Sequence, residues 1–65
     1  MRVEVNGEGM VPRANTLAEL LLDCGFETAA VATAVNGQFV PRGARVGHRL
    51  ADGDRIEVLS PMQGG

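Results

Sequence analysis

The tripeptide Val-Asn-Gly occurs twice in this 65-residue chain, at 5–7 and at 35–37. Asn-Gly between alternating apolar segments is the strongest short signal for a β-hairpin, because both turn residues need a positive φ. Val-Pro-Arg follows each turn, at 11–13 and 40–42. Proline cannot donate a ladder hydrogen bond, so each return strand is expected to lie at an edge or to end there. The segments between these strings differ in length, and we therefore do not infer a duplicated domain.

A single helix is predicted between the two hairpins. Thr16 and Glu19 stand at the spacing of a capping box, in which each side chain bonds the backbone N–H of the other residue. Four apolar residues then fall on one helical stripe: Leu17, Leu20, Leu21 and Cys24. Gly25 stands where a left-handed glycine ends a helix. We expect a helix over 17–24, with Cys24 buried as a small apolar side chain rather than acting as a nucleophile.

Alternating or apolar segments predict strands on both sides of this helix, at 1–5, 9–13, 31–35, 38–40 and 55–59. The Gly- and Arg-rich segment 42–50 is expected to be a loop that can include a helical turn, and 51–54 a tight turn. Parallel pairing of the first and last strands, with the helix across them, would bury their apolar residues against the leucines: Val3, Val5, Ile56 and Val58.

This order of elements predicts an α+β fold with a mixed sheet of four or five strands and one helix on one face. That is the ubiquitin-like β-grasp arrangement. We expect a domain over 1–60 and a flexible C-terminal tail over 61–65 that ends in Gly-Gly.

Composition narrows the classes of function. Eight acidic residues against six arginines give a net charge of -2, which argues against binding to a phosphate backbone. No apolar run approaches the roughly 18 residues of a membrane span, and Glu4 interrupts the segment where a signal peptide would be apolar. We therefore expect a cytoplasmic protein. Cys24 and His48 are too few for a zinc site, so no metal is expected.

The chain ends in Gly64-Gly65. Two residues without Cβ make a thin segment that can enter a narrow channel and bring the terminal carboxylate to a reaction centre in another protein. A carboxylate must be activated, for instance as an acyl-adenylate made with ATP, before a nucleophile attacks it. Gly65 is therefore the predicted reactive residue, and Gly64 gives it access. The alternative is a frayed terminus without function.

The chain is not expected to bind a cofactor of its own. The segment 7–9 begins a dinucleotide-binding pattern, but Pro12 stands where the third glycine belongs, and we interpret the segment as a turn. ATP is therefore expected to be used by a separate activating enzyme. So short a chain rarely builds a catalytic cleft, and we expect a protein co-substrate rather than an enzyme.

The sequence resembles the ThiS family, the bacterial sulfur carriers of thiamine biosynthesis. The resemblance covers essentially the whole chain. It rests on the helix start Thr-x-x-Glu-Leu-Leu at 16–21, on Asn-Gly-Gln-Phe-Val-Pro-Arg at 36–42, on Asp-Gly-Asp-Arg-Ile at 52–56, and on the terminal Met-Gln-Gly-Gly at 62–65. The short N-terminal strand with its asparagine turn also agrees.

The resemblance implies that an E1-like adenylyltransferase of the ThiF type adenylates the Gly65 carboxylate. Sulfur from a donor such as a cysteine desulfurase then converts it to a thiocarboxylate, and a thiazole synthase of the ThiG type takes that sulfur. The carrier is expected to be a monomer when free. The small subunit of molybdopterin synthase is usually longer and richer in aromatic residues before Gly-Gly, so ThiS is favoured. A carrier for tRNA thiolation, a ubiquitin-like modifier and a non-covalent interaction module stay open.

Four residues are candidate contacts with these partners: Phe39, Arg42, Leu59 and Met62. Leu59 has the opposite strand parity to Ile56 and Val58, so it is expected to point away from the helix, where an exposed apolar residue can serve a partner. The arginines of the 42–50 segment (Arg42, Arg45 and Arg49) either pair with acids of a partner or form a solvated loop.

The chain contains six arginines and no lysine. One explanation is a genome that favours arginine. The other is protective, because a protein whose own C-terminus becomes an activated acyl group then has no side-chain amine to acylate.

Overall fold

The structure, a computed structural model, describes residues 1–60. These residues form five strands: β1 (Val3–Val5), β2 (Glu8–Met10), β3 (Ala32–Val35), β4 (Gln38–Val40) and β5 (Arg55–Leu59). They also form one α-helix, α1 (Leu17–Asp23), and two 3₁₀ helices, η1 (Thr28–Ala30) and η2 (Arg42–Gly47). The predicted tail over 61–65 lies outside the described residues.

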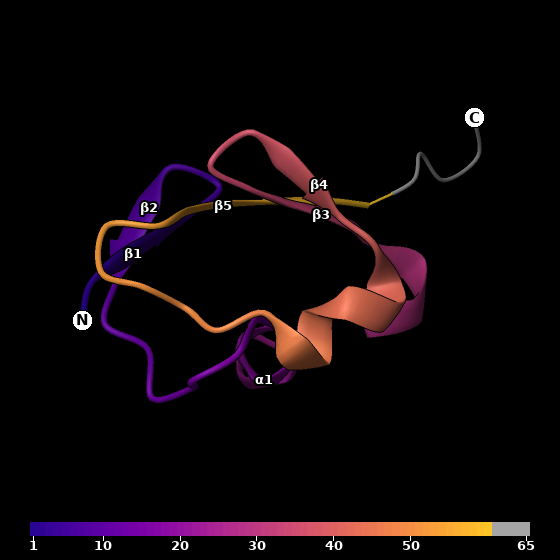
Figure 1. The fold of residues 1–65 in the computed structure, drawn as a ribbon, viewed down its shortest axis with the longest axis horizontal. Helices are drawn as coiled ribbons and strands as arrows, with labels where there is room; N and C mark the ends of the chain where they lie inside the picture. The colour runs from indigo at the N-terminus through magenta and orange to yellow at the C-terminus, as the bar shows by residue number, and fades with distance from the viewer. Residues whose placement is uncertain (61–65) are drawn as a thin grey trace.

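The strands form one mixed sheet in the order β2-β1-β5-β3-β4. The first and last strands, β1 and β5, pair in parallel, whereas the other neighbours are antiparallel. The predicted central parallel pair is therefore confirmed. Figure 1 shows α1 and η2 together on one side of the sheet. Among the described residues, the opposite face stays uncovered, and we call it the open face.

Both predicted hairpin turns are confirmed. Asn6 and Gly7 have φ values of 52° and 85°, and Asn36 and Gly37 have 52° and 83°. Two successive residues with positive φ are typical of the type I′ turn, whose twist suits a tight hairpin. The first return strand, β2, ends at Met10 rather than continuing to residue 13, so the first Val-Pro-Arg string lies beyond the ladder.

The helix begins with the predicted capping box. The Thr16 hydroxyl accepts the Glu19 N–H at 3.2 Å, and the Glu19 carboxylate accepts the Thr16 N–H at 3.3 Å and the Asn15 N–H at 2.9 Å. The helix ends at Asp23, and Gly25 follows with a φ of 81°. These bonds fix the start of a helix of only seven residues.

The core lies between α1 and the covered face of the sheet, as expected. Its buried apolar residues are Val3, Ala14, Leu17, Leu20, Leu21, Val35, Val40, Ile56 and Val58. Val5, which we expected inside, is only half-buried. Burying each leucine side chain stabilises the fold by about 2 kcal/mol.

The prediction that Cys24 is buried is wrong, because the side chain is exposed. The helix has ended at Asp23, and Cys24 lies beside the edge strand β2, where its Sγ is 4.0 Å from the Met10 Sδ. The buried face of the helix therefore ends at Leu21.

Arg45 is also a correction, since we expected it on a partner contact or in a solvated loop. It is 4% exposed. Its Nε donates to the Thr33 hydroxyl at 3.0 Å, and its two terminal nitrogens donate to the carbonyls of Thr28 and Val31 at 2.8 and 2.6 Å. The predicted helical turn is η2, and it brings this guanidinium under the sheet to tie η1 to β3.

The Asp-Gly-Asp turn before β5 is held mainly by hydrogen bonds to its two carboxylates. Asp52 Oδ1 accepts the Arg2 N–H at 2.8 Å, and the Gly53 N–H donates to the Arg2 carbonyl at 2.7 Å. Asp54 is 7% exposed and accepts from the Ala51 N–H and from the Asn36 carboxamide at 2.8 and 2.9 Å. These carboxylates therefore hold the start of β5.

Candidate functional site

The strand that leads toward the terminal glycines is the central strand of the sheet. β5 pairs with β1 on one edge and with β3 on the other, and it is followed by Ser60, the last described residue. Met62, Gly64 and Gly65, the predicted tail residues of the site, lie outside the described residues. Because it is hydrogen-bonded on both edges, β5 resists local opening and gives the segment that follows it a fixed starting point.

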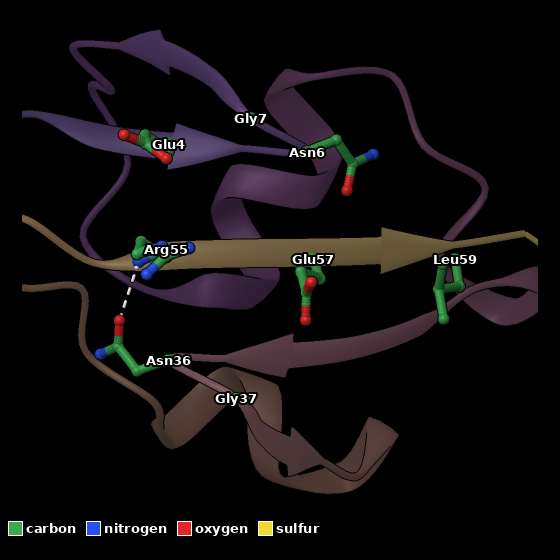
Figure 2. Close-up of a pocket in the computed structure, with 8 residues that line it drawn as sticks. All are labelled: Glu4, Asn6, Gly7, Asn36, Gly37, Arg55, Glu57 and Leu59. Atoms are coloured by element: carbon green, nitrogen blue, oxygen red, sulfur yellow. Dashed lines mark hydrogen bonds between the residues drawn. The ribbon is translucent and has the colours of Figure 1, made fainter.

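Side chains of β5 alternate between the core and the open face. Ile56 and Val58 are buried, whereas Arg55, Glu57 and Leu59 are exposed. Leu59 is 68% exposed, which confirms that it points away from the helix. Figure 2 looks onto this open face, with Arg55, Glu57 and Leu59 protruding from it in a row.

A broad depression of about 520 Å³ lies on the open face. The two Asn-Gly turns line it on opposite sides of β5, and side chains of β1 and β5 line its floor: Glu4, Arg55, Glu57 and Leu59. It therefore presents both signs of charge, with the apolar Leu59 at the end of β5 from which the chain leaves the sheet. Such a surface suits a protein partner better than a small ligand that needs enclosure.

Two large apolar residues stand on the open face, Leu59 at the end of β5 and Phe39 on the edge strand β4, level with Glu57. Phe39, 69% exposed, pairs across β4 and β3 with Ala34, and Leu59 pairs across β5 and β3 with Ala32. The short side chains of these two alanines leave a shallow surface between Phe39 and Leu59. We call Phe39, Ala34, Ala32 and Leu59 the Phe39–Leu59 patch.

A second hollow, of about 340 Å³, begins beside this patch where β5 ends. It is lined by alanines 29, 30 and 32, together with Val31, Leu59 and Ser60. None of these residues is charged, so the hollow suits an apolar side chain of a partner. The Arg45 contacts to the carbonyls of Thr28 and Val31 hold this segment in place.

The predicted contact residues do not all come together. Phe39 and Leu59 share the open face, whereas Arg42 is exposed at the start of η2 and is not part of the large depression. Arg49 is exposed and His48 is half-buried. Arg45 is buried and is therefore not available to contact a partner protein.

Within residues 1–60, no three side chains of His, Cys, Asp or Glu come together as metal ligands. No helix of this part of the chain has the length and apolarity to cross a membrane. Partial burial and the Asp23 carboxylate raise the pKa of the Cys24 thiol above its ordinary value. A thiol with a raised pKa is a poor nucleophile at neutral pH, so Cys24 is not suited to the chemistry of a reactive cysteine.

Two asparagines that we had considered only as turn residues contact β5 through their side chains. Asn6 exchanges two hydrogen bonds with the backbone of Val58, and Asn36 accepts the Arg55 N–H at 2.9 Å. Figure 2 shows the second of these contacts. The sequence signal for these contacts was the repeated Val-Asn-Gly string. Glycine at both positions would satisfy the turn, so a repeated asparagine indicates a role for its side chain.

Comparison with known proteins agrees with this architecture. A crystal structure of the thiamine biosynthesis protein ThiS from Geobacter metallireducens is 32% identical, with both chains covered completely and a TM-score of 0.81. An NMR structure of a thiamine biosynthesis protein from the same organism is also 32% identical, with a TM-score of 0.79 over 100% of this chain and 88% of that one. No curated protein matches the chain significantly.

The fold is thus the predicted ubiquitin-like β-grasp. The ThiS family model matches residues 2–65, nearly the whole sequence and both terminal glycines. Because that match covers far more than half of the chain, this protein belongs to the ThiS family.

Proposed function

We propose that this protein is a sulfur carrier of thiamine biosynthesis, and that the carboxylate of Gly65 carries the sulfur. The observation that carries the proposal is the family match, which continues to residue 65. A central strand, β5, leads toward that residue from a folded domain. The chain therefore acts as a protein co-substrate, and partner enzymes supply the catalysis.

The chemistry begins with activation of a poor electrophile. A carboxylate oxygen of Gly65 attacks the α-phosphorus of ATP within an E1-like enzyme of the ThiF type, and pyrophosphate leaves. Hydrosulfide then attacks the acyl carbon and displaces AMP. Where a cysteine desulfurase is the donor, its persulfide sulfur attacks instead, AMP leaves, and a thiol reduces the S–S bond of the resulting acyl disulfide. The product is a C-terminal thiocarboxylate, which a thiazole synthase of the ThiG type uses as its sulfur source. Gly64 keeps the approach to Gly65 free of side chains.

The open face is the proposed docking surface for these enzymes. Phe39 and Leu59 are exposed by 69% and 68% and belong to the Phe39–Leu59 patch, which reaches the end of β5 at Leu59. An exposed apolar cluster of this kind is typical of a surface that binds a partner. Met62 and Arg42 are further proposed contacts, from the tail and from η2.

Mass spectrometry tests the central step. The purified protein is incubated with ATP, a cognate E1-like enzyme and a sulfide source, and we expect the mass increase of one sulfur-for-oxygen exchange at Gly65. A protein that lacks Gly64 and Gly65 is the control and should acquire no sulfur. Thiocarboxylate formation that persists without these glycines would refute the proposal.

The docking surface has its own test. We expect Phe39→Ser and Leu59→Ser each to raise the KM of the adenylating enzyme for the carrier by about tenfold, because apolar anchors dominate such contacts. Val46, which is 73% exposed on η2, provides the control Val46→Ser. An equal rise in KM for all three variants would contradict this choice of surface.

The open face also supports a second candidate, a ubiquitin-like module that binds partners without covalent chemistry. That function predicts unchanged partner binding after removal of Gly64 and Gly65 and no ATP–pyrophosphate exchange with the intact protein. A ubiquitin-like modifier instead predicts isopeptide adducts on lysines of target proteins in cells.

A further inference from the structure

The side chain of Asn6 continues the ladder between β1 and β5 after the β1 backbone has turned away. In the parallel ladder, the Asn6 N–H donates to the Ile56 carbonyl at 2.9 Å. The next bond of such a ladder would join the Val58 N–H to the Asn6 backbone carbonyl. Here the Asn6 Oδ1 accepts the Val58 N–H at 2.8 Å, and its Nδ2 donates to the Val58 carbonyl at 3.2 Å. The carboxamide thus replaces one peptide unit.

This contact lies close to the end of the folded domain. The paired residues of β1 and β5 end at Val5 and Ile56, whereas the pairing of β3 with β5 continues to Leu59. Val58 is two residues from Ser60, the last described residue. Within residues 1–60, Asn6 is therefore the last hydrogen-bonded contact on the β1 edge of β5.

We propose that Asn6 is a positioning residue for the reaction at the C-terminus. By holding Val58 on the edge opposite β3, it fixes the end of β5 from both sides and so sets the direction in which the chain continues toward Gly65. Asn6 acts through Val58 and touches no reacting atom. This inference rests on the proposed function, because it assigns a role in presenting Gly65 to the adenylating enzyme.

The physical basis is the conformational entropy of the C-terminal segment. A terminal carboxylate reacts with bound ATP only when it reaches a narrow range of positions and directions. A segment that starts from a fixed strand end samples fewer unproductive directions than one that starts from a frayed end. Asn6 is therefore expected to affect the chemical step more than the docking of the carrier.

Asn36 provides a matched control within the same chain. It has the same φ of 52° in the same kind of turn. Its Oδ1 accepts the Arg55 N–H and its Nδ2 donates to the Asp54 carboxylate, both at 2.9 Å. Like Asn6, it also lines the depression on the open face. The difference is that Asn36 holds the start of β5, at Arg55, and not its end.

The test compares Asn6→Gly with Asn36→Gly. Glycine keeps the positive φ without strain and removes only the carboxamide. In Asn6→Gly we expect hydrogen exchange of the Val58 amide to accelerate by about tenfold, since its partner is lost. We expect kcat for carrier-dependent ATP–pyrophosphate exchange to fall by about fivefold, with KM changed equally in both variants. In Asn36→Gly, kcat and the exchange rate of the Val58 amide should stay within about twofold of their values in the unsubstituted protein.

Each other outcome is decisive. Unchanged Val58 exchange or unchanged kcat in Asn6→Gly would overturn the inference, and so would an equal fall in kcat in both variants, which indicates only a loss of stability. If the unsubstituted protein supports no pyrophosphate exchange, the proposed function fails first, and the role of Asn6 in that reaction fails with it. Activity of the unsubstituted protein together with an inert Asn6→Gly substitution overturns the positioning role alone.

Discussion

Arg45 is a buried cation that no carboxylate among residues 1–60 neutralises by hydrogen bonding. Its guanidinium is satisfied by two backbone carbonyls and the Thr33 hydroxyl, whose own proton goes to the Val40 carbonyl at 2.9 Å. Thr33 is itself only 2% exposed. Arginine suits this place because three different nitrogens of its planar fork each reach one acceptor, whereas lysine would have to donate to all three from a single nitrogen.

Replacement of Arg45 should therefore be costly. We expect Arg45→Met to lower the free energy of unfolding by about 3 kcal/mol, because apolar methionine leaves buried acceptors without donors. Urea denaturation measures the change. Arg42→Met, at the exposed start of the same 3₁₀ helix, should stay within about 0.5 kcal/mol of the unsubstituted protein. Equal losses in the two variants would show that the buried contacts contribute little.

Cys24 offers a second prediction at the scale of a residue. Its raised pKa, caused first by partial burial and then by the Asp23 carboxylate, means that less thiolate is present at a given pH than in an ordinary cysteine. Alkylation by iodoacetamide near pH 8 should therefore be slower in the folded protein than in the same chain unfolded in urea. Asp23→Asn should increase the rate in the folded protein. A folded rate above the unfolded rate would contradict the assigned shift.

Among the elements, the helix depends on its first turn. A helix of seven residues is far below the length at which isolated helices are stable in water, so its cap contributes a large share of its local stability. We expect Thr16→Ala to lower the free energy of unfolding by about 1 kcal/mol, because the Glu19 N–H loses its acceptor. Thr16→Ser keeps the hydroxyl and should be nearly neutral by urea denaturation. A loss as large for serine as for alanine would exclude the hydroxyl as the cause.

The elements also show which features a sequence reveals and which it hides. The Asn-Gly turns and the Thr16 cap are local patterns, and both were predicted correctly, as was the outward direction of Leu59 from strand parity. The contact of Asn6 with Val58 joins residues 52 positions apart, so no local pattern contains it. Arg45 was misplaced for the same reason, because its acceptors lie in segments separated from it in sequence.

At the scale of the whole molecule, the residues that stabilise the fold lie on one side of the sheet, and the residues proposed to contact partners lie on the other. The core lies on the α1 side of the sheet, whereas Phe39 and Leu59 stand on the open face. β1 and β5 are parallel, so the start of the chain and the Asp-Gly-Asp turn lie at one end of the sheet and Ser60 at the other (Figure 1). Substitutions near the two ends of β5 therefore differ in their distance from Ser60, after which the segment with the proposed reactive residue follows.

This separation makes the lysine-free composition testable. An activated Gly65 acyl group would acylate a nearby amine, and the chain has six arginines but no lysine. Ala29 is exposed in the hollow beside Ser60, whereas Ala51 is exposed before the turn at the opposite end of β5. Five residues follow Ser60 and span at most about 18 Å, so a lysine at position 29 lies within easier reach than one at position 51.

We therefore expect Ala29→Lys to form an internal isopeptide bond when it is incubated with ATP and the adenylating enzyme without a sulfur donor. Mass spectrometry would detect the loss of one water and a peptide that links residues 29 and 65. Ala51→Lys adds the same charge to another exposed alanine and should form this product more slowly. If Ala29→Lys is adenylated and forms no adduct, lysine is tolerated beside the reactive terminus. The absence of lysine then reflects only a preference for arginine.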